Sequence, residues 1–436
     1  MKKDRIEKRT RDCLLSLFLM ALGCSSSLNP PGIVSQPESP SATGGKWSAG
    51  DLDPTSDAGL PVMGYNTFHD VGCAPEEWTL RARADALVQS GMKDAGYEYV
   101  NLDDGWSDLT RDANGDLRPD PAKFPSGMKS LTDYIHSKGL KAGIYLTCGQ
   151  KTYADLPGSL GTEQRDADQI AEWGFDFLKY DYRLMAGDPP DRDPKAENIQ
   201  MSNALRNNRH GRRIVFSLCE HGRSEPWKWA PGYAQMWRVS TDIKDIWDGA
   251  YEGGWSFNKI LDDRAAQTAG FSGPGQVNDY DMLVVGLYGQ HWMGPGMTDT
   301  DYRSHFSLWC LLGAPLIHGV NPAAMNSATR DILMNPELIR VDQDASGSAQ
   351  RLRSADGLDT WVRKLADGSW AVGLYNRTAT DQNMTLTASD LGLPADGRLD
   401  PRDLWAKVDL GTFTRQVTRW VKSHECVVLK VWGSGG

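Results

Sequence analysis

Four apolar runs in this chain each end in acidic residues, at Asp103-Asp104, Asp181, Glu220 and Asp242. Carboxyl groups gathered in one pocket can act as a nucleophile, as a general acid and base, or as acceptors for sugar hydroxyl groups. In a barrel of parallel strands the carboxyl ends of all strands converge on one face. The pattern therefore predicts a barrel enzyme whose acids meet around a single pocket.

Asp181 follows a strand-like run that also contains Lys179. Because alternate residues of a strand face the same side, both side chains should point into the pocket. There Lys179 can keep a carboxylate ionised or bind a substrate hydroxyl, and an ionised Asp181 could be a nucleophile. Two structural alternatives stay open: Asp181 could cap a following helix, or it could simply pair with Lys179.

Asp242 ends another run, four residues after Arg238. Glycosidic cleavage needs a partner acid that is protonated at the start, in a partly desolvated site. Asp242 is the candidate for this role. The alternative is that it caps a helix that begins at Ile243.

Asp103 and Asp104 form an adjacent pair that could accept hydrogen bonds from neighbouring hydroxyls, with Trp106 offering a ring for stacking. An Asp-Gly turn is the structural alternative. The loop at 278–281 delivers further acids, including Asp281. The histidines are scattered and the cysteines lack metal-type spacing, so we expect no metal. We also expect no cofactor, because the candidate nucleophile and the candidate acid and base are side chains.

The runs between these acids alternate between strand-like and helical patterns, which predicts an α/β fold. We expect a (β/α)8 TIM barrel over 46–344 and a C-terminal antiparallel β-sandwich over 345–436. The predicted barrel strands are 62–66, 97–102, 141–147, 175–181, 213–220, 236–241, 281–285 and 315–318. Helices are predicted at 76–95, 127–138 and 164–173, and sandwich strands at 360–364, 370–375, 383–387 and 426–431.

The composition and the amino-terminal segment indicate where the protein works. The net charge of -10 argues against nucleic acid as a partner, whereas sixteen Trp residues suit sugar rings. Residues 1–24 read as a bacterial lipoprotein signal that ends at Cys24, the expected lipidation site, and 25–45 read as a flexible tether. We therefore expect an exported protein, anchored by lipid to a bacterial membrane, in the periplasm or at the cell surface. A plain secretory signal and a secreted protein are the alternatives.

Several stretches together resemble glycoside hydrolase family 27, the α-galactosidase or melibiase family. Matching segments occur in the family's order from about 61 to 344. They include Asn-Leu-Asp-Asp-Gly-Trp at 101–106, Leu-Lys-Tyr-Asp at 178–181, Ser-Leu-Cys-Glu at 217–220 and Asn-Asp-Tyr-Asp-Met-Leu at 278–283.

The resemblance implies a retaining mechanism, with Asp181 as the nucleophile and Asp242 as the acid and base. It further implies a substrate-binding role for a larger set of residues: Asp103 and Asp104 on the 4- and 6-hydroxyls, Glu220 on the 2-hydroxyl, and Tyr145, Lys179, Arg238, Asp281 and Phe68 along the wall. The expected activity is exo-acting release of terminal α-D-galactosyl residues from oligo- or polysaccharides. The alternatives are another family 27 specificity, such as a β-L-arabinopyranosidase or another α-glycan hydrolase, and a non-catalytic carbohydrate-binding lipoprotein. The sequence does not fix an oligomeric state.

The chain also departs from the family pattern. Tyr65 and Phe68 stand where the family usually has tryptophans, and Gly105 replaces a cysteine that would pair with Cys73. Tyr153 and Arg183 replace both members of a second disulfide. These departures alter the walls of the expected pocket and leave both expected catalytic acids in place.

Overall fold

The computed structural model describes residues 59–182 and 192–434. The predicted signal segment with Cys24, the tether and Arg183 lie outside these described residues. Eight parallel strands curl into a barrel-like sheet, which confirms the predicted class. In sheet order the strands are β10 (Leu316–His318), β1 (Met63–Asn66), β2 (Tyr99–Leu102), β3 (Lys141–Thr147), β4 (Phe177–Asp181), β5 (Val215–Cys219), β6 (Met236–Arg238) and β9 (Val277–Asp279).

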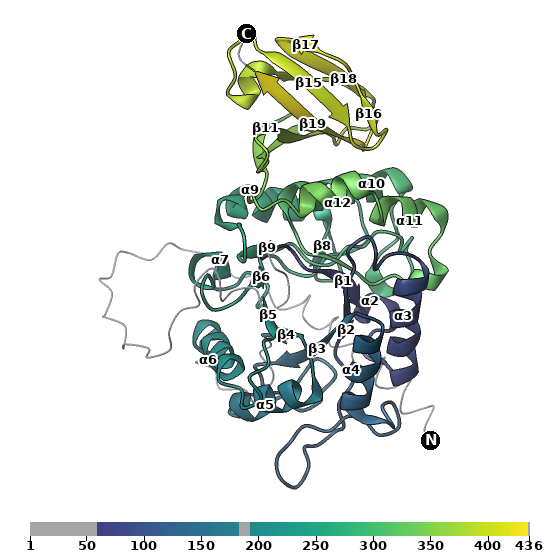
Figure 1. Ribbon diagram of the computed structural model, residues 1–436, viewed down its shortest axis with the longest axis vertical. Helices are drawn as coiled ribbons and strands as arrows, with labels where there is room; N and C mark the ends of the chain where they lie inside the picture. The colour runs from purple at the N-terminus through teal and green to yellow at the C-terminus, as the bar shows by residue number, and fades with distance from the viewer. Residues whose placement is uncertain (1–58, 183–191, 435–436) are drawn as a thin grey trace, which may run out of the picture.

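The strands form where the sequence is apolar on both faces, as expected for a parallel sheet covered by helices. Every residue of β2 and β5 is buried. The helices lie around the outside of the barrel (Figure 1). They are α2 (Phe68–Val71), α3 (Glu77–Gln89), α4 (Gly127–Ser137), α5 (Glu163–Trp173), α6 (Pro194–Arg206), α7 (Pro226–Trp229), α8 (Phe257–Ile260), α9 (Ala266–Thr268), α10 (Asp299–Leu312), α11 (Ser327–Leu333) and α12 (Pro336–Asp342). Within the described residues, none of these helices combines the length and the apolar character that crossing a bilayer requires.

The seventh strand was predicted at 281–285, and this prediction is wrong. The strand is β9, which ends at Asp279. The chain then bends at Asp281, whose φ is 83°, and returns to the sheet only where Leu283 makes an isolated parallel bridge with His318 on β10. The apolar run after Asp281 is buried core rather than a hydrogen-bonded strand, because burial alone does not require ladder pairing.

The carboxyl-terminal part is a β-sandwich, as predicted. Its larger sheet contains β11 (Gln350–Ala355), β12 (Leu358–Lys364), β13 (Trp370–Asn376), β19 (Cys426–Ser434), β15 (Arg398–Asp403), β16 (Val408–Asp409) and β17 (Phe413–Thr414). The smaller sheet pairs β14 (Gln382–Thr387) with β18 (Gln416–Val421). Side chains from both sheets, including Leu374, Leu386, Val417 and Leu429, form one buried cluster between them.

The sandwich packs directly on the barrel's helices. α10 contacts β12, β13 and β19, and the yellow domain lies against this helix in Figure 1. Trp361 and Tyr375 of the sandwich belong to the same apolar cluster as Leu311 of α10. In addition, the Tyr375 hydroxyl donates a hydrogen bond of 2.7 Å to Asn258 of α8. The two domains therefore share a core.

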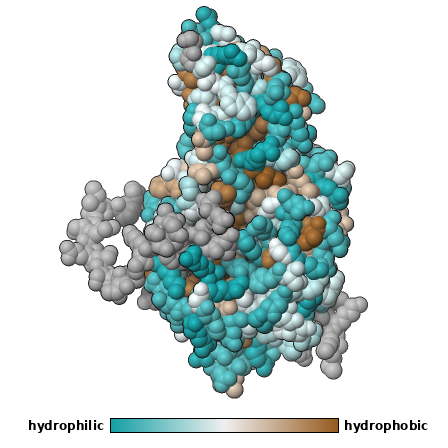
Figure 2. All heavy atoms as spheres, in the orientation of Figure 1, coloured by the Kyte–Doolittle hydropathy of each residue, from teal (hydrophilic) through white to brown (hydrophobic). Residues whose placement is uncertain are grey.

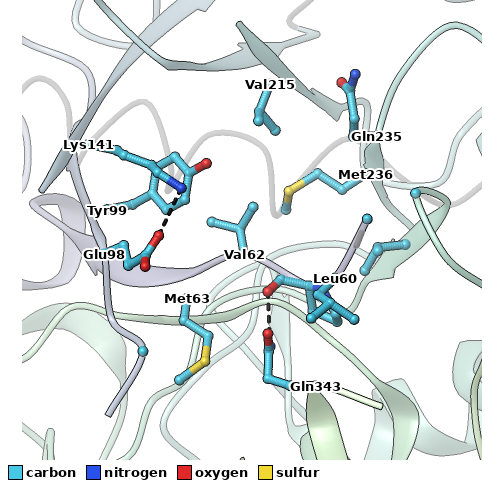
Figure 3. A pocket seen from close by; sticks show the side chains of 15 residues that line it. Leu60, Val62, Met63, Glu98, Tyr99, Lys141, Val215, Gln235, Met236 and Gln343 are labelled. Carbon is cyan, nitrogen blue, oxygen red and sulfur yellow. Dashed lines mark hydrogen bonds and ion pairs between the residues drawn. The ribbon is translucent and has the colours of Figure 1, made fainter. Parts of the chain in front are cut away.

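A cavity of about 320 Å³ lies at the end of the barrel where the strands begin. Figure 3 shows its lining, which includes Met63, Tyr99 and Met236, each at the amino end of its strand. The only ion pair drawn there is between Glu98 and Lys141, at 2.8 Å. Because the acids that end the strands are at the opposite face, this cavity is separate from them.

The shared core predicts that barrel and sandwich unfold together. We expect one transition in calorimetry, and a loss of about 3–5 kcal/mol for Trp361→Ala, because this change empties a fully buried indole site. The matched control is Trp420→Ala, since Trp420 keeps 58% of its exposure on the sandwich surface and should lose little stability. Two separate transitions, or equal losses in both variants, would contradict a shared core.

Candidate active site

The predicted acids meet in a pocket at the carboxyl ends of the strands. Of the residues predicted to bind or react, the structure brings all except Glu220 to this pocket: Phe68, Asp103, Asp104, Tyr145, Lys179, Asp181, Arg238, Asp242 and Asp281. They come from loops and strand ends far apart in the sequence. The barrel geometry is the reason, because successive parallel strands all end on the same face.

Asp181 is the last residue of β4 and is 5% exposed. Its Oδ2 accepts a hydrogen bond of 3.1 Å from the Tyr145 hydroxyl, and its Oδ1 is 3.2 Å from Nε2 of His221. Burial alone would raise the pKa of Asp181, but His221 and the positive charge of Lys179 lower it below the usual value. Asp181 is therefore ionised. It caps no described helix, because the next one, α6, is capped by Asp193.

Asp242 lies beyond the end of β6 and keeps 41% of its side-chain exposure, because it faces the mouth of the pocket. Its Oδ1 is 3.1 Å from Arg238 Nη2 and 3.4 Å from Nδ1 of His221. The partial burial of Asp242 opposes its ionisation, but the charges of His221, Arg238 and Lys179 hold the pKa of Asp242 well below its usual range. The helix-cap alternative is wrong, since the next described helix is α8 and begins at Phe257.

Asp103 and Asp104 form the floor of the pocket through different partners. Asp103 Oδ2 accepts hydrogen bonds from Lys179 Nζ at 2.9 Å and from the Asn66 amide at 2.8 Å. Asp104 instead accepts from two backbone N–H groups, those of Gly105 at 2.7 Å and Ala154 at 2.8 Å. Burial raises the pKa of Asp104 to about 6. Both carboxyl groups are thus fixed in position before any ligand arrives.

Arg238 lies between Asp242 and Asp281 and forms an ion pair with each. It is 4% exposed, and its Nη2 lies 2.9 Å from Asp281 Oδ2 as well as close to Asp242. The same Asp281 oxygen accepts a 2.7 Å hydrogen bond from the backbone N–H of Ile243. Asp281 thereby holds the segment that carries Asp242, as well as the guanidinium beside it.

The predicted contact of Glu220 with the sugar is not supported by its position. The Glu220 carboxylate turns away from the pocket and accepts hydrogen bonds from the backbone N–H and hydroxyl of Ser224, at 2.9 Å and 2.7 Å. Cys219 and His221 line the pocket in its place. The chain leaves β5 after Cys219 and turns at His221, whose φ is 59°, and this turn accompanies the outward position of the Glu220 carboxylate.

The prediction that Trp106 offers its ring for stacking on a sugar is not supported by its position either. Its indole is 3% exposed, donates to the Tyr145 carbonyl at 2.9 Å, and packs edge-on against Trp173. An aromatic wall is instead supplied by Phe68 and Trp292, whose rings meet edge to face with centroids 5.0 Å apart. Trp106 therefore supports Tyr145 from behind.

Sequence reasoning missed several lining residues, chiefly His221, Tyr153, His69 and Trp292. No local sequence pattern marks His221, because its side chain enters the pocket from a turn residue with φ 59° rather than from an extended strand. Trp292 comes from a loop distant from every acidic motif, and no local pattern marks it. Burial lowers the pKa of His69 to about 3, so this imidazole is neutral.

One group in the described part of the chain has donor atoms close enough to surround a cation. Asp181, Cys219 and His221 have ligand atoms within 4.8 Å of one another. A thiol must lose its proton to bind a metal, but burial and the nearby Asp181 charge raise the pKa of Cys219 well above normal. We therefore assign no metal to this group, and Cys219 is a buried free thiol, as predicted.

Comparison with known proteins agrees with this architecture. The sequence profile of the family described as alpha galactosidase A matches residues 68–344, and that of the alpha galactosidase C-terminal beta sandwich domain matches 355–431. The alpha-galactosidase of Cyamopsis tetragonoloba is 40% identical over 368 residues, which cover 84% of each chain.

Solved structures give the same result. Alpha-galactosidase I from Mortierella vinacea is 34% identical with a TM-score of 0.80, over 86% of this chain and 97% of that one. The Saccharomyces cerevisiae alpha-galactosidase solved with raffinose is 26% identical with a TM-score of 0.78, over 86% and 98%. The chain therefore belongs to the α-galactosidase family, glycoside hydrolase family 27.

Proposed function

We propose that this protein releases terminal α-D-galactosyl residues from oligo- or polysaccharides by a retaining double displacement. The observation that carries the proposal is the pair Asp181 and Asp242. These two carboxylates face one pocket, from the end of β4 and from the segment after β6, and differ in exposure. A buried, ionised carboxylate suits a nucleophile. A carboxylate at the pocket mouth suits proton exchange with a leaving group and with water.

In the first step Asp181 attacks the anomeric carbon, and the bond from that carbon to the leaving oxygen breaks. Tyr145 fixes the orientation of the attacking carboxylate through its hydrogen bond. Asp242, in its acid form, gives the leaving oxygen its proton. The product is a glycosyl ester on Asp181. A carboxylate lone pair forms its new C–O bond, and the electron pair of the broken bond remains on the leaving oxygen.

In the second step water attacks the same carbon from the face that the leaving group vacated. Asp242 accepts the proton of this water, and the ester bond to Asp181 breaks. Two inversions give net retention, so the released sugar is the α-anomer. The reaction needs only side chains, and no cofactor is proposed.

The fixed acids at the pocket floor support a hexose as the substrate. Asp103 and Asp104 present adjacent carboxyl groups whose remaining lone pairs can accept from neighbouring hydroxyls, and Lys179 Nζ can donate to one of them. Phe68 and Trp292 provide the apolar face that sugar rings require. Raffinose, seen with the yeast relative, is a suitable test substrate.

We expect α-galactose as the first product from raffinose and melibiose, observed by proton NMR during turnover. p-Nitrophenyl α-galactoside should be hydrolysed much faster than the β-L-arabinopyranoside, which lacks the 6-hydroxyl. The β-anomer as first product would disprove retention. Good turnover of the arabinopyranoside alone would favour the second family specificity, and binding without any turnover would favour a carbohydrate-binding lipoprotein.

The roles of the two acids can be separated with azide. We expect Asp181→Gly to lose about four orders of magnitude or more in kcat/KM, as removal of a nucleophile does elsewhere. Added azide should then give the β-galactosyl azide by one displacement. With Asp242→Gly and an activated galactoside, azide should give the α-galactosyl azide by two.

The matched control is Asp263→Gly, because the Asp263 carboxylate pairs with Lys259 and does not line the pocket, so turnover should stay unchanged. Azide products of the same configuration from both pocket variants would contradict the assignment.

We also propose that the protein is exported and lipid-anchored to a bacterial membrane at Cys24. Support comes from the sequence of the amino-terminal segment, which lies outside the described residues. Cys24→Ser should abolish incorporation of labelled fatty acid during bacterial expression and move the protein out of the membrane fraction. Cys148→Ser is the control, because Cys148 is buried in the folded protein. Unchanged membrane association of Cys24→Ser would reject the anchor.

A further inference from the structure

The imidazole of His221 lies between Asp181, the proposed nucleophile, and Asp242, the proposed acid and base. Nε2 is 3.2 Å from Asp181 Oδ1, and Nδ1 is 3.4 Å from Asp242 Oδ1. The side chain is 10% exposed. Its backbone has φ 59°, a left-handed conformation that residues other than glycine seldom adopt. The fold thus maintains an uncommon backbone geometry that brings this ring into the pocket.

Both ring nitrogens of His221 face oxygen acceptors. A neutral imidazole has a single N–H, so it can donate to only one of the two carboxylates. If both carboxylates are ionised, only an imidazolium can donate a hydrogen bond to each of them. The alternative placement of the same proton is a neutral ring beside a protonated Asp242. Both arrangements carry a net charge of minus one over the three groups, and they differ only in the position of one proton.

The surrounding charges favour the imidazolium in the empty pocket. Burial lowers the pKa of His221, but Asp242 and Asp181 more than offset this and raise it to about 9. Other groups near this cluster are Arg238 beside Asp242, Lys179 near both carboxylates, the Cys219 thiol, Tyr153, and, on the neighbouring turn, Glu220 and Arg223. Arg238 and Lys179 stabilise Asp242 in its ionised form.

This electrostatic arrangement conflicts with the proposed role of Asp242. A general acid must hold a proton when the glycoside arrives, yet the cations around Asp242 keep it ionised. The proton that the reaction needs is nevertheless within hydrogen-bonding reach, on the ring 3.4 Å away. His221 is thus placed to supply it.

We propose that His221 is a positioning residue that stores the catalytic proton between turnovers and passes it to Asp242 when a glycoside binds. The inference rests on the proposed function of Asp181 and Asp242. In the transfer the Nδ1–H bond breaks and an O–H bond forms on Asp242, which leaves a neutral ring. After water has attacked the glycosyl ester, Asp242 holds the proton of that water and returns it to Nδ1, so no proton is gained or lost over the cycle.

Binding itself supplies the driving force for the transfer. Asp242 is the exposed member of the cluster, and a bound glycoside would cover it and exclude water from it. Loss of water disfavours a pair of opposite charges relative to the corresponding neutral pair. The proton therefore moves from the ring to the carboxylate in the complex, at the moment when the leaving oxygen needs it.

The test compares pH profiles of kcat/KM for melibiose. His221→Asn is the variant of choice, because asparagine tolerates the left-handed backbone and does not titrate. We expect the basic limb of the variant to move down by about two pH units from near pH 9. That shift gives about a 10-fold loss at pH 8, about a 100-fold loss above pH 9, and a much smaller loss at pH 5. The deficit should be smaller for p-nitrophenyl α-galactoside, whose leaving group needs less protonation.

His210→Asn is the matched control, since His210 is exposed on the outside of the barrel and its profile should follow that of the wild type. A basic limb of His221→Asn that superimposes on the wild type would overturn the proposal. Absence of turnover in the wild type would instead count against the proposed function alone.

A second measurement needs neither turnover nor a folded His221 variant. In wild-type protein labelled with 15N-histidine, one ring should have both nitrogens protonated at pH 7 and lose a proton only near pH 9. Asp242→Asn should lower the titration of this ring by at least about one pH unit, because it removes the nearest negative charge. If every histidine ring is neutral at pH 7, the proposal fails.

Discussion

Five carboxyl groups share one pocket in this protein because three cationic side chains lie among them, of which Arg238 is buried and Lys179 and His221 are largely covered. Lys179 pairs with Asp103, Arg238 pairs with Asp242 and Asp281, and His221 lies between Asp181 and Asp242. Asp104 is the exception, because it has no cationic partner. Two backbone N–H groups donate to its carboxyl group, and burial raises its pKa to about 6. Unpaired buried charges are very costly, so this alternation of signs decides which acids are ionised. The chemistry assigned to each acid follows from its cationic neighbour.

The sequence predicted those parts of the fold and site that depend on repeating local patterns. The endings of β2, β4 and the segment after β6 located Asp103, Asp181 and Asp242, because parallel strands converge whatever lies between them. The wrong predictions have a common cause: an apolar or aromatic residue can be predicted to be buried, but its hydrogen-bond partners and contacts cannot be predicted from this. The run after Asp281 is as apolar as a strand but makes a single bridge, and Trp106 is aromatic but fully covered. Glu220 and His221 needed the turn after β5, whose left-handed residue has no sequence signature.

The departures from the family's disulfide pattern coincide with local rebuilding around the pocket. Gly105 has φ 95°, and a Cβ added there would lie 2.1 Å from the Cys73 carbonyl oxygen, so a cysteine does not fit this backbone. The buried Lys123 ammonium instead donates to the carbonyls of Gly105, at 2.7 Å, and Cys73, at 3.4 Å. Tyr153, at the position of the other missing bridge, lines the pocket. At the first position, the Lys123 ammonium thus links the segments that carry Cys73 and Gly105, while the Cys73 sulfur itself is in a disulfide.

The barrel closes between its two end strands, β9 and β10, at a seam where residues 280–283 replace a hydrogen-bonded strand. This seam affects how the substrate specificity of the enzyme can change. Elsewhere around the barrel a continuous ladder dictates the course of each strand, but at the seam a single bridge from Leu283 leaves the preceding residues to be held by side chains. The Asp281 carboxylate contacts Arg238 and the backbone N–H of Ile243, and the Tyr280 hydroxyl is hydrogen-bonded with Thr268. Mutation can therefore reshape this wall of the sugar site while the topology of the barrel is inherited unchanged, which makes the seam a natural origin for new specificities.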